Sequence, residues 1–375
     1  MRVLFTASTA SHIRTFHLPY LAAFRQAGWR VAVACGGTDG DIPGADEVLL
    51  LPFEKKITAP ANLHAQQMLR RFLKKTPCDL ICAHTSLAAF FTRRAAAGLK
   101  GRPPVINMVH GYLFDDETPW AKRQLLLGAE RLTAGTTDLV LAMNQYDLDT
   151  ARRYHLGRRV EYVPGIGVDF SPLDGLESLD RAAIRRELGV SPQDFLLVYA
   201  AEFSHRKNQA FLIRALPKLP RRVKLVLAGR GALWEECRTL ARELGVSDRV
   251  IFPGHTAMPP LYAAADAAVS ASRSEGLPFN VMEAMYAGLP VAASAVKGHT
   301  DLITHGESGL LYPFGDEAAL CRAVEALVGD PGLARSLGQQ ARVAVSPFAL
   351  ETVLPQVMAA YRSVLPATAE TGASV

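Results

Sequence analysis

Short apolar runs alternate with longer amphipathic segments along almost the whole chain. In the first half these runs occupy residues 3–7, 30–35, 47–53, 80–84, 105–110, 139–144 and 160–164. In the second half they occupy residues 195–200, 223–228, 249–253, 267–270, 291–294 and 310–312. Unbroken runs rich in Val, Leu and Ala are typical of parallel strands that are buried on both faces. Their alternation with helices predicts an α/β fold with parallel sheets and right-handed crossovers.

The segment 62–75 has the pattern of an amphipathic surface helix, and Asn62 suits its N-cap position. Its apolar face should contain Leu63, Leu69, Phe72 and Leu73, and its basic face Arg70, Arg71, Lys74 and Lys75. Further helices are predicted at residues 87–98 and 350–365.

A stretch with two glycines and a proline, residues 165–172, marks a boundary between domains. We predict two facing Rossmann-like domains, residues 1–165 and 166–349. The helix at 350–365 follows a complete second sheet, so we expect it to return to the first domain. Residues 366–375 have the composition of a flexible tail. Ligands of open parallel sheets bind beyond the carboxyl ends of the strands, so we expect the chemistry between the two domains.

The net charge of +5 is unevenly distributed. Residues 1–165 contain 21 Lys and Arg against 14 Asp and Glu, a balance of +7, whereas residues 166–375 contain 20 against 22, a balance of −2. A basic first half suggests an anionic partner, and no nucleic-acid-binding motif accompanies it. We therefore expect attraction to an anionic membrane surface and no binding of nucleic acid. The basic residues concerned are those of segment 62–75 and Arg93, Arg94, Lys122 and Arg123.

Cysteine usage and hydropathy indicate where the protein works. The five cysteines have no CxxC spacing and lie in apolar surroundings, as expected of a reduced cytosolic protein. No stretch of about 18 residues lacks charge, so we expect no membrane-spanning helix. Together with the basic first half, these features predict a cytoplasmic protein held peripherally at the inner face of the cell membrane.

The most informative segment runs from Ser274 to Pro290, after one predicted strand and through one helix. It contains Glu275 and Glu283, eight positions apart, with the turn Gly276-Leu277-Pro278 between them and Asn280 at the start of the helix. A helix that begins here presents its positive end to an anion. Two carboxylates at this spacing can reach different parts of one extended ligand.

This segment resembles the E-x7-E signature of the family 4 glycosyltransferases, which have the two-domain GT-B fold. Residues 201–208 resemble the family's phosphate loop, and Lys207 matches its lysine. Many members have an arginine where this chain has Glu202, whereas a branch that makes capsular and extracellular polysaccharides is similar to this chain in having glutamate. Arg206 is then a candidate replacement for that arginine.

The resemblance spans nearly all of residues 2–345. In the first half it rests on the opening segment with His12, on His84 and on His110, at the ends of predicted strands. Gly165-Ile166-Gly167-Val168-Asp169 resembles the family's linker. One departure is the sequence Ser8-Thr9-Ala10-Ser11, where a Gly-Gly loop is common.

The resemblance implies a retaining glycosyltransferase that moves a sugar from a nucleotide-diphosphate sugar, with UDP expected, to a lipid-linked saccharide in bacterial surface polysaccharide assembly. Residues 1–165 would bind the acceptor and residues 166–349 the donor. The implied catalytic residues are Glu275 at the sugar hydroxyls, Lys207 at the diphosphate and His110 beside the sugar. The implied donor-binding residues are Glu283 at the ribose, Arg206, Gly276, Leu277, Pro278 and Asn280. His84, His12 and Glu202 are candidates on the acceptor side. We expect Lys207 to be an exposed loop residue.

No metal and no cofactor are expected. Asp39 and Asp41 flank a glycine in a predicted turn, and Asp147 and Asp149 should diverge on a helix. No His, Cys or Glu cluster has the spacing of metal ligands. The motifs of a serine hydrolase and of a dinucleotide oxidoreductase are missing. Two alternatives stay open at this point: a nucleotide-sugar epimerase of similar fold, and a non-catalytic nucleotide-sugar-binding subunit, which Glu202 keeps in consideration.

Overall fold

The computed structural model describes residues 1–366 and divides the chain into two compact units. The first unit contains Met1–Gly167 together with the residues from Glu351 onward, and the second contains Val168–Leu350. The tail predicted for residues 366–375 lies, from residue 367 on, outside the described residues. Across residues 1–366, no helix combines the length and the apolar character needed to cross a bilayer.

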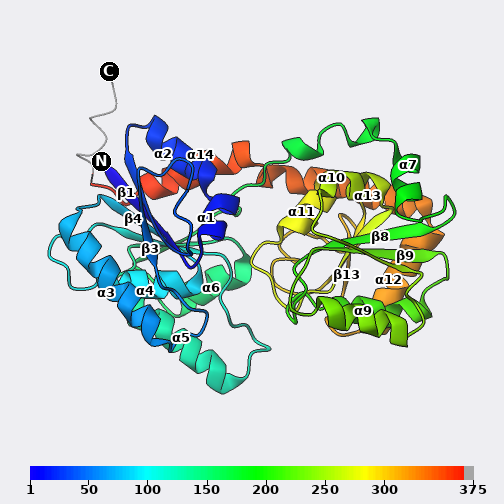
Figure 1. Ribbon diagram of the computed structural model, residues 1–375, viewed down its shortest axis with the longest axis horizontal. Coiled ribbons are helices and arrows are strands. Elements are labelled where there is room, and N and C mark those ends of the chain that lie inside the picture. The colour runs from blue at the N-terminus through cyan, green and yellow to red at the C-terminus, as the bar shows by residue number, and fades with distance from the viewer. Residues whose placement is uncertain (367–375) are drawn as a thin grey trace. The chain divides into compact units, whose positions relative to one another are not determined.

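A parallel sheet of seven strands forms the centre of the first unit, in the order β3-β2-β1-β4-β5-β6-β7 (Figure 1). The strands are β1 Arg2–Ala7, β2 Arg30–Gly36, β3 Glu47–Leu51, β4 Leu80–His84, β5 Val105–Val109, β6 Leu139–Ala142 and β7 Arg159–Tyr162. The helices are α1 Ala10–Phe16, α2 Leu18–Gln26, α3 Pro60–Lys75, α4 Ser86–Ala96, α5 Trp120–Ala134, α6 Gln145–Arg153 and α14 Leu350–Arg362. Figure 1 shows α1, α2 and α14 on one side of the sheet and α3, α4 and α5 on the other.

The second unit has a parallel sheet of six strands in the order β10-β9-β8-β11-β12-β13. The strands are β8 Phe195–Ala200, β9 Val223–Ala228, β10 Val250–Gly254, β11 Ala267–Ser270, β12 Val291–Ser294 and β13 Leu310–Tyr312. The helices are α7 Arg181–Glu187, α8 Gln209–Ala215, α9 Trp234–Glu243, α10 Met258–Ala264, α11 Phe279–Tyr286, α12 Glu317–Gly329 and α13 Pro331–Val345. Short 3-10 helices lie at Ser171–Leu173, Leu176–Ser178, Leu216–Lys218 and Ser346–Phe348.

The predicted fold class is confirmed: both units are Rossmann-like, and every predicted strand is present with its ends shifted by at most a few residues. The inner strands are buried on both faces because helices pack against each side of the sheets, whereas edge strands such as β7 are partly exposed. For example, Val3, Leu4 and Phe5 of β1 all have side chains with no exposed surface.

The C-terminal helix α14 is part of the core of the first unit. Its fully buried Tyr361 stacks on Phe24, with ring centroids 6.1 Å apart, and meets the edge of Phe5. An aromatic side chain buried in this way removes a large apolar area from water. The predicted return of this helix to the first domain is therefore confirmed.

The prediction for α3 is wrong in three details. The helix begins at Pro60, two residues before the expected start of the segment, and Asn62 is not its N-cap. Asn62 is instead fully buried inside the helix, where its side chain accepts from the backbone N–H of Glu54 and donates to the carbonyl of Lys56. Leu63, assigned to the apolar face, is 54% exposed. A tertiary contact of the asparagine with residues 54–56 replaces the local capping role that its type suggests.

Candidate active site

The strand order of the second sheet reverses between β8 and β11. In open α/β sheets, ligands bind beyond the carboxyl ends of the strands at such a reversal point. The loops that leave these two strands are residues 201–208, after β8, and residues 271–278, after β11. The first carries Lys207 and the second carries Glu275, so the residues predicted from two separate motifs lie in two adjacent loops.

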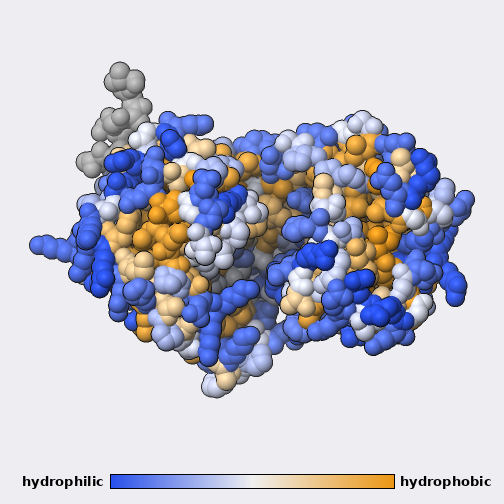
Figure 2. Space-filling model, in the orientation of Figure 1, coloured by the Kyte–Doolittle hydropathy of each residue, from blue (hydrophilic) through white to orange (hydrophobic). Residues whose placement is uncertain are grey.

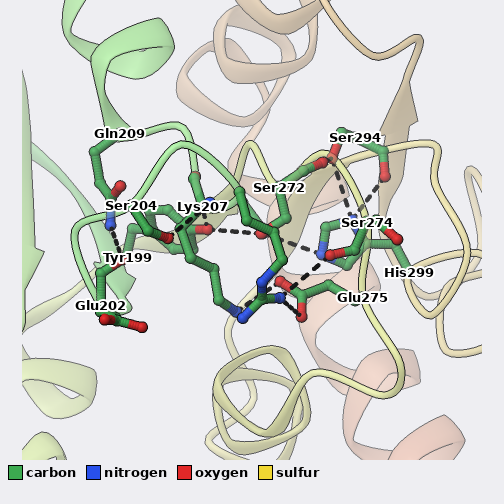
Figure 3. Close-up of polar contacts among 12 residues, drawn as sticks. Tyr199, Glu202, Ser204, Lys207, Gln209, Ser272, Ser274, Glu275, Ser294 and His299 are labelled. Carbon is green, nitrogen blue, oxygen red and sulfur yellow. Dashed lines mark hydrogen bonds and ion pairs between the residues drawn. The ribbon is translucent and has the colours of Figure 1, made fainter. Parts of the chain in front are cut away.

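Three charged side chains meet between these loops. The Nζ of Lys207 donates to Oε1 of Glu275 at 2.6 Å, and the guanidinium of Arg206 donates to Oε2 of the same carboxylate at 2.6 Å. Figure 3 shows the carboxylate of Glu275 turned toward the end of the Lys207 side chain. Backbone contacts join the same loops, because the N–H of Arg273 donates to the carbonyl of Arg206. The cluster has two cations and one anion.

Burial makes these ion pairs strong. The side chain of Glu275 is 6% exposed and that of Lys207 is 11% exposed, whereas that of Arg206 is 52% exposed. Burial alone would raise the pKa of Glu275, but the charges of Lys207 and Arg206 outweigh it and lower this pKa from 4.5 to about 2. Burial lowers the pKa of Lys207, and the neighbouring Glu275 opposes that effect. The expectation of an exposed Lys207 is therefore wrong: the lysine is enclosed by the carboxylate that follows the neighbouring strand.

Further polar groups surround the cluster on the side of the strands. The hydroxyl of Tyr199 donates to the carbonyl of Lys207 and also contacts the hydroxyl of Ser272 at 2.8 Å. His299 is fully buried near Glu275, with Nδ1 2.7 Å from the carbonyl of Ser294 and Nε2 3.0 Å from a serine hydroxyl. Burial lowers the pKa of His299, while Glu275 opposes that shift. The sequence analysis missed this histidine, although it stands one residue after the loop glycine Gly298.

Three glycines bring backbones close together around the cluster. Gly298 has φ +83°, and a Cβ added there would lie 2.8 Å from the Cβ of Glu275. A Cβ on Gly229 would lie 2.2 Å from the carbonyl oxygen of Ala201, and one on Gly231 would lie 2.4 Å from that of Phe203. Only glycine permits such approaches. These glycines therefore allow the loop of residues 201–208 and the loop that carries Glu275 to pack closely against the neighbouring backbone.

The helix α11 begins directly after the turn that was predicted to precede it. Pro278 precedes its first residue, and Gly288, with φ +76°, follows its last turn. Half-buried Glu283 accepts a hydrogen bond of 2.9 Å from the hydroxyl of Tyr262. Burial raises the pKa of Glu283, and the hydrogen bond from Tyr262 opposes this shift. The two predicted glutamates thus have opposite environments, since one carboxylate is neutralised by cations and the other meets only a neutral donor among the contacts described.

The remaining donor-side candidates of the sequence lie around the start of the same helix. Gly276 and Asn280 are half-buried, whereas Leu277 and Pro278 are buried. Glu202 is exposed in the loop after β8, and its backbone carbonyl accepts from Gln209. The charge of its side chain favours the protonated form of Lys207 and so raises the pKa of that lysine, but less than Glu275 does.

In the first unit the strand order reverses between β1 and β4. Here the segment 8–11 replaces the expected glycine loop, and Ser8 contacts Thr85 through both its N–H, at 2.9 Å, and its hydroxyl, at 2.7 Å. Thr85 has φ +60°, which is costly for a β-branched residue and requires such support. The glycine needed for close approach is on the neighbouring strand, because a Cβ on Gly36 would lie 2.3 Å from the carbonyl oxygen of Ser8.

Four histidines gather at this point of the first unit. The predicted residues His12, His84 and His110 are joined by His17, a residue at the α1–α2 junction to which the sequence analysis gave no role. Nδ1 of His84 lies 3.2 Å from Nε2 of His110, and the rings of His17 and His84 have centroids 3.8 Å apart. Burial lowers the pKa of all four, to about 4 for His12.

His17 is the least satisfied member of the group. It is fully buried, and neither of its ring nitrogens has a hydrogen-bond partner among the described residues. A neutral imidazole has one N–H, and leaving a buried N–H unpaired costs about 1–3 kcal/mol. A cavity of about 210 Å³ opens beside His110, where it is also lined by Thr85, Ser86 and Glu130.

Two predictions on charged residues have opposite outcomes. As expected, the helical pair diverges, since Asp147 is buried and bonded to Asn144 while Asp149 is exposed. Arg93, assigned to a basic surface, is instead fully buried and pairs with Glu130 at 2.8 Å. A salt bridge in the interior requires its partner nearby, which a pattern within one helix does not reveal.

Comparisons with known proteins agree with the fold and the motifs. Residues 20–170 match the family model described as Glycosyltransferase Family 4, and residues 180–344 match the one described as Glycosyl transferases group 1. EpsD of Bacillus subtilis strain 168, which its name places among glycosyltransferases, is 33% identical over 347 residues, covering 91% of each chain.

Solved structures share the whole architecture. HepE of Anabaena, in a complex with UDP-glucose, superposes with a TM-score of 0.78 at 24% identity, covering 97% of this chain and 100% of its own. WaaG, a glycosyltransferase involved in lipopolysaccharide biosynthesis, has a TM-score of 0.75 at 19% identity, covering 96% and 99%. Both matched family models and EpsD are described as glycosyltransferases. These matches favour a glycosyltransferase over the two alternatives, an epimerase and a non-catalytic subunit. This chain therefore belongs to the family 4 glycosyltransferases and has the GT-B fold.

Proposed function

We propose that this glycosyltransferase transfers a sugar from a UDP-sugar to a lipid-linked saccharide, with retention of the anomeric configuration, in the assembly of a bacterial surface polysaccharide. The buried cluster of Lys207, Arg206 and Glu275 at the reversal point of the second sheet carries this proposal. Support for the nucleotide comes from HepE, whose structure contains UDP-glucose. Support for the pathway comes from the resemblance to the polysaccharide-making branch.

The cluster supplies the charge that a departing diphosphate needs. Its two cations and one carboxylate leave a net positive charge when no ligand is bound. A diphosphate that contacts Lys207 and Arg206 takes them from Glu275, and the freed carboxylate can then accept hydrogen bonds from hydroxyls of the donor sugar. The positive end of α11 adds to the same potential. Electrostatic stabilisation of this kind can contribute roughly 3 kcal/mol for one group.

Glu283 and His110 have separate roles in the proposal. Glu283 accepts hydrogen bonds from the ribose, in place of the hydroxyl of Tyr262 that it accepts now. His110 contacts the sugar that is transferred, and His84 orients its ring through their mutual hydrogen bond. The leaving phosphate serves as the base for the acceptor hydroxyl, so no nucleophile from the protein is required. Transfer needs no divalent metal, because the cations of the cluster neutralise the diphosphate.

Membrane attachment belongs to the first unit in this proposal, but through fewer basic residues than the sequence suggests. Arg93 is buried, and Arg70 is half-buried with its guanidinium bonded to backbone carbonyls. The exposed basic residues of the group are Arg71, Lys74, Lys75, Arg94 and Lys122. Figure 2 shows both hydrophilic and hydrophobic residues on the surface along α3 and α5.

Helix α5 adds an apolar component. Trp120, Leu125 and Leu132 are 76%, 70% and 67% exposed, next to exposed Lys122 and Arg131. Exposed Trp and Leu beside Lys and Arg are typical of helices that lie in a membrane interface. We infer that α5 inserts these side chains while the basic residues contact anionic lipid.

Calorimetry with UDP and turnover with UDP-sugars together test the donor site. Glu283→Gln should weaken UDP binding about tenfold or more, since a hydrogen bond to a charged group contributes about 1.5–3 kcal/mol. Glu275→Gln should keep or tighten UDP binding, because it frees two cations, and should lower turnover about 100-fold. The exposed Glu243→Gln is the matched control. An equal loss of UDP affinity in both site variants contradicts the assigned roles. The function itself is contradicted if, in a thermal-shift panel of nucleotide sugars, none raises the melting temperature of the protein.

A further inference from the structure

Three histidines of the first unit bring one ring nitrogen each into a common space. His12, His17 and His110 offer nitrogens that all lie within 4.8 Å of one another. They come from separate places, since His12 is in α1, His17 is at the α1–α2 junction and His110 follows β5. The ring centroids of His12 and His110 are 4.8 Å apart, and those of His12 and His17 are 5.1 Å apart.

The contacts of these rings are unusual for buried polar side chains. Nε2 of His12 and both nitrogens of His17 are buried with no hydrogen-bond partner among the described residues. Buried polar atoms of a folded protein are normally paired, so unpaired nitrogens that face one another indicate a ligand. The group that offers these nitrogens consists of histidines alone, and imidazoles offer lone pairs to an ion only when the rings are neutral.

We propose that His12, His17 and His110 form a binding site for one Zn²⁺ ion, with an exchangeable fourth position. Three imidazoles and one open position form a known arrangement for Zn²⁺, and imidazole suits this ion better than it suits Mg²⁺ or Ca²⁺. At a Zn–N distance of about 2.0–2.1 Å, tetrahedral nitrogens lie about 3.3 Å apart. The nitrogens, which lie within 4.8 Å of one another, must therefore approach further when the ion binds.

The surroundings meet the other requirements of such a site. His12 and His110 are half-buried, so the ion can enter from the surface, whereas His17 is fully buried. The side chain of Thr9 caps α1 by accepting from the N–H of His12, which positions that residue. Nδ1 of His84 lies 3.2 Å from Nε2 of His110, and this contact fixes the orientation of the His110 ring. Three neutral ligands leave the charge of the ion uncompensated, so an anion such as hydroxide favours the fourth position.

This site differs from the sequence expectation of no metal, and it does not serve the diphosphate. No sequence pattern indicates it: His12 and His17 are five positions apart, His110 is 93 positions beyond His17, and the three meet only through the fold. The bound ion connects three segments of the first unit. It therefore stabilises that unit, and it competes with the donor sugar for the side chain of His110.

The test measures metal binding to the full chain without a histidine tag, in the absence of substrates. Chelator-treated protein is titrated with Zn²⁺ against a chromophoric competitor, and with Co²⁺ while its visible absorption is recorded. We expect one equivalent to bind, with the intense visible bands of four-coordinate Co²⁺. His12→Gln and His17→Gln should lose this equivalent, whereas His64→Gln, an exposed histidine of the same unit, should keep it.

X-ray absorption of the Zn²⁺-loaded wild-type protein makes the test independent of whether the variants fold. Three nitrogen ligands at about 2.0–2.1 Å with the scattering pattern of imidazole are expected. Sulfur ligands, fewer than three imidazoles, or an unchanged affinity in His12→Gln overturns the proposal. Since no nucleotide sugar is present in the metal titrations, a negative result there does not contradict the proposed transfer reaction. A negative result in the UDP experiments likewise does not contradict the metal site.

Discussion

Replacing Lys207 by alanine is expected to destabilise the second unit and not only to impair catalysis. The substitution leaves the carboxylate of Glu275, which is 6% exposed, with Arg206 as its remaining ion-pair partner. The two cations lower the pKa of Glu275 from 4.5 to about 2, which corresponds to about 3 kcal/mol. Removing one partner of a buried ion pair costs about 3–5 kcal/mol. Because Arg206 stays, we expect a loss near the lower end, about 3 kcal/mol.

Urea unfolding measures this loss. Trp29 and Trp120 lie in the first unit and Trp234 in the second, so a background in which the first two are phenylalanine makes Trp234 the reporter of the second unit. At about 1–3 kcal/mol per molar urea, the midpoint should fall by at least about 1 M. Adding Glu275→Gln to the lysine variant should restore much of the stability, because the buried charge is then removed.

The matched control is Lys218→Ala, which removes the ion pair of an exposed lysine with Glu317 in the same unit. A midpoint unchanged from the wild type is expected, since exposed ion pairs contribute little. If Lys207→Ala unfolds at the same urea concentration as Lys218→Ala, with the same dependence on urea, then the carboxylate of Glu275 does not need its lysine and the argument from burial is wrong.

Three further results are expected. The pKa of Glu275 in the folded protein is lowered, so its contribution to stability is complete above about pH 4.5 and is lost as the pH falls through about 2. Over this range the urea midpoint of the wild type should therefore drop more steeply than that of Glu275→Gln. Parallel curves for the two proteins would contradict this prediction. In flotation with anionic vesicles, Leu125→Gln combined with Leu132→Gln should reduce binding while the exposed Leu244→Gln of the second unit does not, and equal flotation of both would exclude α5 as the inserting helix. Transfer should persist in excess EDTA, and complete loss that is restored by Mg²⁺ or Mn²⁺ would show that the diphosphate is neutralised by an ion.

The strands could be predicted because their signal is local. A run such as Leu225-Val226-Leu227 in β9 is apolar at consecutive positions since both faces of the sheet are covered, and no knowledge of partners is needed to recognise it. The turn at the start of α11 and Gly288 at its end are likewise local. The pair Glu275 and Lys207 was found through separate motifs, each attached to the end of a strand.

The errors concern residues whose role depends on distant neighbours. Lys207 in a loop and Arg93 on a helix have the sequence context of exposed residues, but each is buried by an acidic partner, 68 and 37 positions away respectively. Asn62 has the residue type of an N-cap but packs into a loop from the preceding strand. The same limit applies to His17, whose unpaired nitrogens become visible only when α1, α2 and β5 are placed together.

The position of α14 has a consequence for how the chain folds during synthesis. The first unit is discontinuous, since Tyr361 fills its core from the far end of the sequence, whereas the second unit is one continuous segment. The ends of that segment are held together, because the N–H of Val168 donates to the carbonyl of Phe348 and the N–H of Leu350 donates to the carbonyl of Val168. During synthesis, the second unit can therefore fold completely before the first unit does. The first unit cannot complete its core until α14 has been synthesised, because Phe5 and Phe24 lack their contacts with Tyr361 until then.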